Sequence, residues 1–331
     1  MRFLTFFAFL VSAVAQLQPP ALTPIEQLKV PENKETYANA DQPQVLNMAG
    51  VSLFGLKDEK GEISQARAKF EKESSNPQLL IEVGMLQDSF MRHADAVQTY
   101  SEGIQKFPKD WRFLRYRGQR YISSRKFPEA IQDLEKARES TKQAYDVAYY
   151  LGLAYYFLGE YDKAEAEFGR CEAQLQQPLS PPEDLMGLTS CEVGREEQAF
   201  LVPLMFWRYL ALRRGGKNAE AKAYAEAVSP LWTLRSNKAF YDALLYFRGT
   251  KEVTEMLDGA NEATRDYLTR SAGVAVQLFT EGERQRACSI WQRNAMDTKW
   301  NHLGVIAAEA EYYLTAKAAC ALYGTAAPKP Q

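Results

Sequence analysis

The fold is decided by residues 145–168, which read YDVAYYLGLAYYFLGEYDKAEAEF. In this stretch Gly152 precedes Ala164 by twelve residues and Phe168 by sixteen. The same arrangement occurs twice more upstream at one constant interval, as Gly118, Ala130 and Leu134 and as Gly84, Ala96 and Tyr100. A constant period of about 34 residues in a helical pattern is typical of stacked helical repeats rather than of a single globular core.

Each repeat is expected to contain two helices joined by a turn. The apolar residues fall on one stripe of each helix, as Leu151, Ala154 and Leu158 do. Helices this short are marginal in water by themselves and need a packed partner. The predicted helices cover residues 78–91, 95–107, 111–124, 128–140, 145–158 and 161–173.

The small residues in register predict close packing of the two helices in each unit. A glycine inside a helix costs roughly 1 kcal/mol relative to alanine. Three such glycines must therefore be offset by the close approach of a neighbouring helix. We expect the three alanines to lie opposite them and the bulky residue, one helical turn further on, to fill the space between units.

These positions resemble the tetratricopeptide repeat, a helix-turn-helix unit of about 34 residues. The third unit matches its pattern best, through Leu151, Gly152, Tyr155, Ala164 and Phe168. Departures from the pattern are Gln87, Arg117 and Cys171. The resemblance implies an all-α fold, a right-handed superhelical solenoid of helix-turn-helix repeats. Its three units would be residues 77–110, 111–144 and 145–178.

The segments on either side of the three units read as degenerate repeats. Residues 45–76 combine an apolar segment, 45–56, that favours a helix with a helical pattern through Ile63 and Phe70. We expect this region to be an N-terminal repeat or cap, because terminal units commonly close such arrays.

The region 179–325 is predicted to contain divergent helical repeats and a C-terminal cap, followed by a tail, 326–331. Gly187 and Ala199 keep the twelve-residue spacing, but Pro203 would kink or rebuild a fourth unit. Ala287 and Trp291 repeat the spacing of the alanine and the bulky residue. Helices are predicted at 219–228, 238–247, 252–257, 264–279 and 284–296, with a last unit opening at Trp300 and ending near Ala321.

The first fifteen residues are predicted to be a secretory signal peptide. They join a positive end at Arg2 to an apolar run and a small-x-small site that ends at Ala15. Cleavage there leaves Gln16 first, and residues 16–44 read as a flexible, proline-bearing linker. A buried N-terminal helix is the alternative. No later run approaches the ~18 apolar residues of a membrane span, so we expect an extracytoplasmic protein, periplasmic or secreted.

Four cysteines in an exported chain suggest disulfides. Three pairings are open, and we favour Cys171 with Cys191 and Cys288 with Cys320, because the first two are close in sequence and the second two fall on helices expected to be neighbours. Buried free thiols are the alternative.

The sequence offers little chemistry for an enzyme. A net charge of −2 favours neither nucleic acid nor an anionic membrane as a partner. The two histidines, His93 and His302, have no second histidine at metal-ligand spacing, and surface or capping roles are expected for them. Nucleophile, phosphate-loop and paired-cysteine motifs are absent. We therefore expect no catalytic residue, metal or cofactor, although two carboxylates could still make a glycosidase.

The resemblance also implies where a partner would bind, because the first helix of each tetratricopeptide unit lines the concave face. The family's clamp for a terminal carboxylate is missing here. We expect a groove suited to a peptide with an acidic residue next to apolar anchors. The alternative is that the arginines are solvated and the tyrosines pack the array. The residues predicted to bind the partner are Arg112, Arg115, Gln119, Tyr149, Leu153 and Tyr156.

These features favour a non-enzymatic scaffold that binds a protein or peptide outside the cytoplasm. Two alternatives remain, an assembly factor for envelope complexes and an all-helical secreted hydrolase. Paired carboxylates with a raised pKa among residues 180–325 would favour the hydrolase.

Overall fold

The computed structural model describes residues 43–177, 183–195, 197–258 and 264–323. The predicted signal peptide, most of the predicted linker and the tail lie outside the described residues. The N-terminal half comprises β1 (Val45–Leu46), β2 (Ser52–Leu53), α1 (Glu62–Lys72), α2 (Pro77–Ser89), α3 (His93–Lys106), α4 (Arg112–Ser123), α5 (Phe127–Ser140), α6 (Tyr145–Phe157) and α7 (Tyr161–Gln176). The C-terminal half comprises the 3₁₀ helix η2 (Cys191–Arg195), α8 (Gln198–Arg214), α9 (Asn218–Glu226), α10 (Lys238–Arg248), α11 (Val253–Met256), α12 (Arg265–Thr280), α13 (Arg284–Ala295), α14 (Leu303–Ala310), the π-helical turn η4 (Glu311–Thr315) and α15 (Lys317–Cys320).

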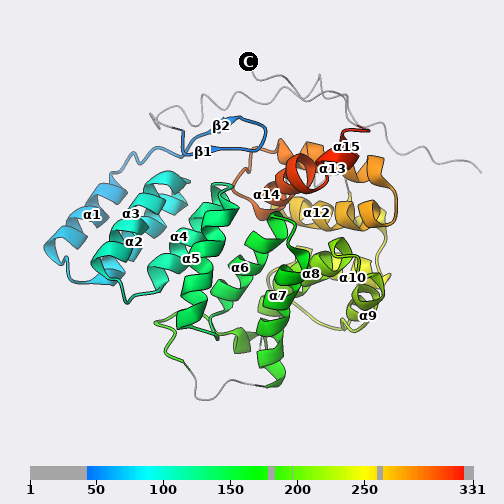
Figure 1. Cartoon of the computed structure of the whole chain (residues 1–331), viewed down its shortest axis with the longest axis horizontal. Helices are drawn as coiled ribbons and strands as arrows, with labels where there is room; N and C mark the ends of the chain where they lie inside the picture. Colours follow the sequence, from blue (N-terminus) through cyan, green and yellow to red (C-terminus); the bar gives the residue numbers. More distant parts are fainter. Residues whose placement is uncertain (1–42, 178–182, 196, 259–263, 324–331) are drawn as a thin grey trace, which may run out of the picture.

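The described chain is mostly helical, as the repeat pattern predicts. Helices α1 to α7 lie side by side in sequence order, and each packs on the next (Figure 1). Helices α8, α10, α12 and α14 gather at the other end, where they also pack against one another. One hydrophobic core runs from α4 to α15, and a second, smaller one joins α1 to α4.

The six predicted helices of the three units are confirmed, with starts within two residues and ends within three of those expected. Their glycines have no room for a side chain. A Cβ on Gly84 would lie 2.3 Å from Tyr100, one on Gly118 2.6 Å from Leu134, and one on Gly152 2.5 Å from Phe168. In each pair the bulky residue belongs to the second helix of the same unit, so the contact forms within a unit rather than between units. The three alanines, Ala96, Ala130 and Ala164, are fully buried.

The turn between the two helices of a unit recurs with the same hydrogen bonds. In each, one residue takes a positive φ, and the next N–H donates to the carbonyl five residues back at 2.8–2.9 Å, which is a Schellman turn. The turns of the three units are separated by the same interval as their glycines. Beyond a longer gap after Gly159, the same turn recurs in the C-terminal half at a constant and slightly shorter interval. The sequence patterns described above did not reveal this second series. The positive-φ residues are Met91, Arg125, Gly159, Gly216, Gly249 and Gly282.

The expected fourth unit, built on Gly187 and Ala199, is wrong. Gly187 has a φ of +82° and lies in the connection between α7 and α8. Ala199 lies in the first turn of α8. The long gap between turns therefore reflects an insertion that contains η2. The helix pair that follows is α8 and α9, which turns at Gly216.

Pro203 lies inside α8 without ending the helix. A proline has no N–H, so the carbonyl of Ala199 loses its helical partner. The side-chain amide of Asn237 donates to that carbonyl instead, at 2.7 Å. The predicted disruption is thus avoided by a hydrogen bond from the residue that precedes α10.

The helix predicted at 45–56 is also wrong, because these residues form a hairpin. Strands β1 and β2 are antiparallel, with Val45 opposite Leu53. The side chain of Asn47 accepts hydrogen bonds from the N–H groups of Ala49 and Val51 at 3.0 and 2.8 Å. Gly50 completes the turn with a φ of +81°. Asparagine and glycine in these positions favour a turn over a helix.

A buried ion pair joins the repeats to the C-terminal helices. Arg125, in the turn between α4 and α5, donates from Nε to Glu309 of α14 at 3.0 Å, and its Nη2 donates to the same carboxylate and, at 2.7 Å, to the carbonyl of Trp300. The two side chains are 4% and 1% exposed. Glu309 also accepts the N–H of Met48, in the hairpin, at 3.1 Å. Three distant parts of the chain therefore meet at one carboxylate.

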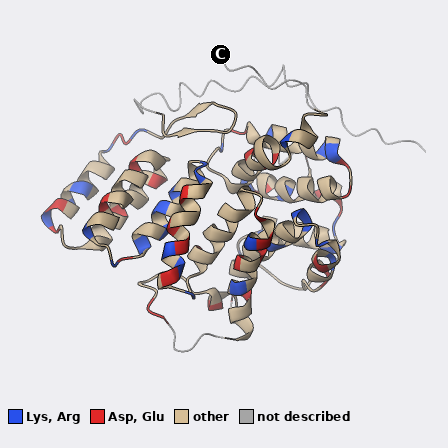
Figure 2. Ribbon diagram, viewed as in Figure 1, with Lys and Arg blue, Asp and Glu red and all other residues tan. Residues whose placement is uncertain are grey.

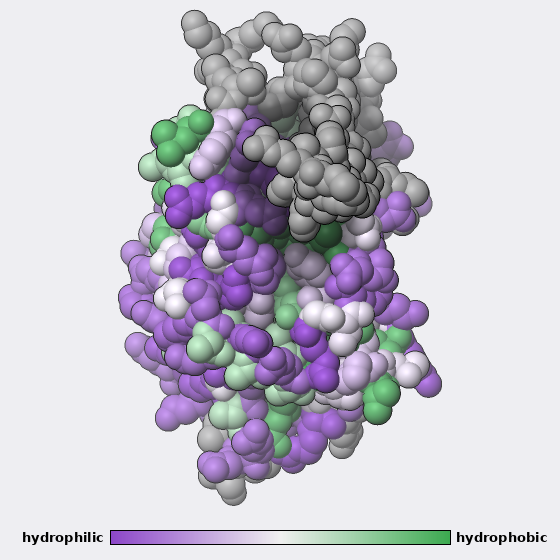
Figure 3. Space-filling model, turned by 90° about the vertical axis from the view of Figure 1, so that its right-hand side faces the viewer, coloured by the Kyte–Doolittle hydropathy of each residue, from purple (hydrophilic) through white to green (hydrophobic). Residues whose placement is uncertain are grey.

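Figure 2 shows basic and acidic residues interspersed on the same helices. The face seen in Figure 3 is mostly hydrophilic, with hydrophobic residues in small separate groups. Among the described residues, no helix is both long enough and apolar enough to cross a membrane.

Candidate functional site

The candidate site is a cavity of about 410 Å³ between α6 and the C-terminal helices. Its walls come from α6, α8, α10 and α12 and from residues 301–304 before and at the start of α14. These elements are far apart in sequence, so the cavity exists only in the folded chain. Aromatic rings dominate the lining, and they belong to Tyr145, Tyr149, Tyr150, Phe200, Phe206, Trp207 and Phe240.

Ring stacking and hydrogen bonds hold the aromatic wall in place. Tyr145 and Tyr149, one turn apart on α6, stack with ring centroids 5.7 Å apart and planes 13° apart. The indole N–H of Trp207 donates to the Tyr149 hydroxyl at 3.0 Å. The Tyr145 hydroxyl donates to the carbonyl of Phe200 at 2.8 Å. Because these polar atoms are satisfied by one another, the wall presents mainly apolar ring surface.

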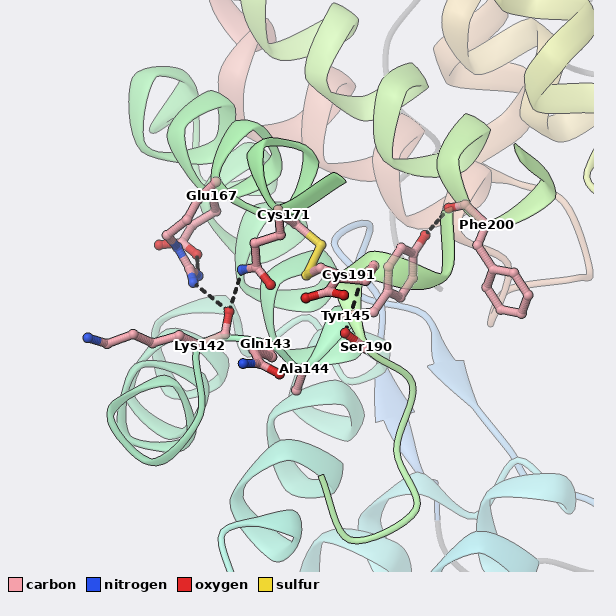
Figure 4. Close-up of a disulfide and its surroundings, with 12 residues drawn as sticks. Lys142, Gln143, Ala144, Tyr145, Glu167, Cys171, Ser190, Cys191 and Phe200 are labelled. Atoms are coloured by element: carbon pink, nitrogen blue, oxygen red, sulfur yellow. Dashed lines mark hydrogen bonds and ion pairs between the residues drawn. A yellow bond between two sulfur atoms is a disulfide. The ribbon is translucent and has the colours of Figure 1, made fainter. Parts of the chain in front are cut away.

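An insertion fastened by a disulfide supports this wall (Figure 4). Cys171 of α7 is bonded to Cys191 of η2. Just before α6, the N–H of Tyr145 donates to the carbonyl of Thr189 at 2.9 Å, and the N–H of Cys191 donates to the carbonyl of Gln143 at 2.7 Å. The insertion therefore pairs with the chain that enters α6, the helix that carries Tyr145 and Tyr149.

The second disulfide lies away from the cavity. It joins Cys288 of α13 to Cys320 of α15. Both cystines have the pairing favoured from the sequence, and no free cysteine is found in the described part of the chain.

One side of the cavity carries a buried ion pair. Arg115 of α4 donates to the carboxylate of Asp146 at 2.5 Å. Its guanidinium also lies over the rings of Tyr116 and Tyr150, 4.3 and 5.2 Å from their centroids. Burial opposes the charge of Arg115, but Asp146 and the surrounding tyrosines outweigh it, so the pKa of Arg115 is raised. Arg115 and Asp146 therefore form an ion pair within the fold.

The part of the lining that comes from α12 and residues 301–304 is polar and includes His302. The Nδ1 of His302 accepts the N–H of Gly304 at 3.1 Å and so caps α14, which confirms the capping role expected for this histidine. Burial and then the positive charge of Arg265 lower the pKa of His302 to about 4. Gly304 is required here, because a Cβ would lie 2.4 Å from the Leu268 carbonyl of α12. The close approach of α12 and α14 brings Arg265 and His302 to the same cavity.

His93 is not a surface residue. It opens α3, is 1% exposed, and lies beside the Trp300 ring at 5.1 Å between centroids. Its Nδ1 is 2.9 Å from the carboxylate of Asp88, which is shared with Arg120. Burial and Arg125 outweigh that carboxylate and lower the pKa of His93 to about 3. His93 is therefore a neutral core residue. No group of three metal-ligating side chains occurs within the described ranges.

The predicted partner-binding residues are placed differently from expectation. Leu153 and Tyr156 are 0% and 1% exposed, so the expectation that they line an open groove is wrong. The Tyr156 hydroxyl donates to Glu311 at 2.7 Å, because the C-terminal helices cover this end of α6. Arg115, as described above, is bound to Asp146. Only Tyr149, of the six, lines the cavity.

The remaining two predicted binding residues lie away from the cavity and have partners within the chain. Arg112 forms an ion pair with Asp110 at 2.7 Å. Gln119 donates to the hydroxyl of Tyr150 at 2.6 Å. Because Tyr156 is buried, the alternative stated in the sequence analysis, in which the tyrosines pack the array, holds for this residue.

We did not predict from the sequence that Arg265, His302 or the rings of α8 and α10 belong to the site. No fixed sequence spacing connects these residues to α6. The sequence therefore predicts the helices that carry them but not their place in the site. Neither models of known protein families nor the curated proteins match this chain. The likeness to tetratricopeptide repeats rests on its own residues and turns.

Proposed function

We propose that this protein is a non-enzymatic scaffold that binds a peptide or protein segment in the aromatic cavity. We further propose that its helix pairs form a right-handed superhelical solenoid of the tetratricopeptide kind. The recurrence of one Schellman turn at nearly equal intervals in both halves of the chain supports this architecture, because it implies the same helix-to-helix geometry in each pair.

The observation that carries the proposed function is the ring-walled cavity. Its volume of about 410 Å³ lies within the ~300–1,000 Å³ of typical ligand pockets. Tyr149 and Trp207 are held by their mutual hydrogen bond, so the wall is formed before a partner arrives. A preformed apolar pocket suits one large side chain of a partner and limits the entropy lost on binding.

We place the protein outside the cytoplasm. Two disulfides support this location, because such bonds persist in oxidising compartments. The apolar N-terminal sequence ending at Ala15 supports it independently. An export assay that found uncleaved protein with reduced cysteines would contradict this part of the proposal.

The hydrolase alternative gains no support at the cavity. Among the described residues that line it, Asp146 is the single carboxylate, and Arg115 holds it as an ion pair. A glycosidase would need a second carboxylate nearby. The assembly-factor alternative would use the same surface and differ only in the identity of the partner.

The proposal can be tested by selecting peptides from a displayed library on the oxidised protein. Asn301→Trp adds a large ring to the lining of the cavity and should abolish binding of the selected peptides. Lys72→Trp, at an exposed position of α1, is the matched control and should leave binding unchanged. Selected peptides that bind the Asn301→Trp protein as well as the wild type would move the binding site away from this cavity.

A further inference from the structure

The charged groups that line the cavity differ in whether they are free to contact a ligand. The lining residues contain two formally charged groups, the carboxylate of Asp146 and the guanidinium of Arg265. Asp146 is already neutralised by Arg115, whose side chain is 7% exposed and cannot turn toward solvent without leaving its aromatic surroundings. Any charge that the cavity offers to a ligand must therefore come from Arg265.

Arg265 is exposed and available to a ligand. It is the first residue of α12. Within residues 43–177, 183–195, 197–258 and 264–323, its guanidinium has neither an ion pair nor a hydrogen bond. The unpaired N–H groups in the first turn of α12 add positive potential at the same place.

His302 supplies a neutral hydrogen-bond donor next to Arg265. Because its Nδ1 accepts the N–H of Gly304, the ring proton of the neutral imidazole must be on Nε2. The burial of the ring and the nearby positive charge of Arg265 keep the imidazole neutral at physiological pH. The preceding residue, Asn301, also lines the cavity. The lining of the cavity thus combines a free cation and neutral hydrogen-bonding groups with the aromatic rings.

We propose that the cavity binds a peptide segment in which a large aromatic side chain is next to the side-chain carboxylate of an aspartate or glutamate. The aromatic side chain fills the ring-walled space, and the carboxylate contacts Arg265 and the Nε2–H of His302. Charge-assisted hydrogen bonds of this kind are stronger than neutral ones. This inference rests on the proposed function and specifies the chemistry of its partner.

The test uses four hexapeptides with blocked ends, so that no terminal charge takes part. They are Gly-Gly-Phe-Asp-Gly-Gly and three counterparts in which Asn or Lys replaces Asp, or Ala replaces Phe. Binding is followed through the indole N–H resonance of Trp207, assigned with Trp207→Phe, because this group donates to Tyr149 in the cavity wall. We expect the Phe-Asp peptide to bind about fivefold more tightly than Phe-Asn, with Phe-Lys weaker still. The Ala-Asp peptide should bind at least about tenfold more weakly than Phe-Asp, since it lacks the anchor.

Two variants separate the carboxylate contact from the anchor. Arg265→Glu, at an exposed position, should reverse the order of the Phe-Asp and Phe-Lys peptides. His302→Asn keeps a good helix cap and should weaken Phe-Asp about threefold without changing Phe-Asn. Lys72→Glu, an equal charge reversal on α1, should change none of the four affinities.

The outcomes distinguish the two levels of the proposal. Equal affinity for Phe-Asp, Phe-Asn and Phe-Lys would overturn the carboxylate contact and leave the cavity as an anchor site. A Phe-Asp preference that survives Arg265→Glu would place the contact elsewhere and also overturn it. If no Phe peptide shifts the Trp207 resonance, both the inference and the proposed function of the cavity fail.

Discussion

Gly152 offers a test of the repeat packing through a single methyl group. In the Gly152→Ala protein, the new Cβ would lie 2.5, 2.6 and 2.8 Å from three ring atoms of Phe168. Phe168 is 0% exposed, so its ring cannot swing into solvent. Alanine gains about 1 kcal/mol in helix propensity, whereas overpacking a filled core costs about 1–3 kcal/mol. The net expectation is a loss of about 1 kcal/mol in the free energy of unfolding.

A second substitution identifies the cause of that loss. Phe168→Leu shortens the opposing side chain and by itself should cost about 1 kcal/mol or more through lost packing. In that background Gly152→Ala should be neutral or stabilising, because the methyl group then has space. The two changes should therefore couple by about 1–2 kcal/mol. Gly169→Ala is the control, since the nearest atoms to its Cβ would belong to the guanidinium end of the Arg208 side chain, at 3.0 Å rather than 2.5 Å, and it should be neutral or stabilising.

The measurement is thermal unfolding of the oxidised proteins by circular dichroism. For a chain of this size, about 1 kcal/mol corresponds to a shift of about 2 °C in Tm. We expect a fall of this size for Gly152→Ala and none in the Phe168→Leu background. A rise in Tm for Gly152→Ala in the wild-type background, like that of the control, would refute the packing derived for this glycine.

Three further predictions concern buried groups. Glu309→Gln should lower the free energy of unfolding by about 3–5 kcal/mol, because it leaves the buried Arg125 guanidinium uncompensated; denaturant melts that match the wild type would contradict this. Replacing both Cys288 and Cys320 by serine should cost about 4 kcal/mol on the chain-entropy model, and an unchanged Tm would show that the bridge adds nothing. The pKa of His93 is lowered to about 3 in the folded state, so only the unfolded state gains a proton as pH falls below about 6.5. Stability is therefore retained above pH 6.5 and falls between that pH and the folded pKa, by up to about 1.4 kcal/mol per pH unit. His93→Gln should flatten the fall in Tm between pH 7 and pH 5, and equal slopes would argue against this histidine as the cause.

Local patterns were sufficient to predict the helices of the three units. Glycine, alanine and a bulky residue at fixed spacing act through contacts within a unit, as Gly152 and Phe168 show. The hairpin was mistaken for a helix because an apolar run of this length does not distinguish the two. The deciding signal was Asn47 followed by Gly50, whose turn hydrogen bonds outweigh helix propensity.

The candidate site depends on contacts that the sequence does not reveal. The resemblance placed Tyr156 on an open face, but its hydroxyl donates a hydrogen bond to Glu311, 155 residues away, and the C-terminal helices bury it. The regular spacing of the turns in the C-terminal half could have been found in the sequence, because Gly216, Gly249 and Gly282 are evenly spaced along the chain. The insertion hid this second series, since Gly187 and Ala199 keep the twelve-residue separation of glycine and alanine by coincidence.

The residues that occupy the Schellman turns show where the repeats make additional contacts. Glycine takes the positive φ in four of the six described turns, whereas Met91 and Arg125 take it at a cost of about 1–2 kcal/mol each. At Arg125 the side chain more than offsets that cost, since it holds Glu309 and the carbonyl of Trp300. Beside Met91, the N–H of Leu56 donates to the carbonyl of Phe90 at 2.7 Å, which attaches the chain after the hairpin to this turn. Both turns in which a residue other than glycine has the positive φ thus lie where the hairpin or the C-terminal helices contact the repeats. Arg125→Gly would therefore relieve the backbone and still destabilise the protein, because the contact to α14 outweighs the strain of the turn.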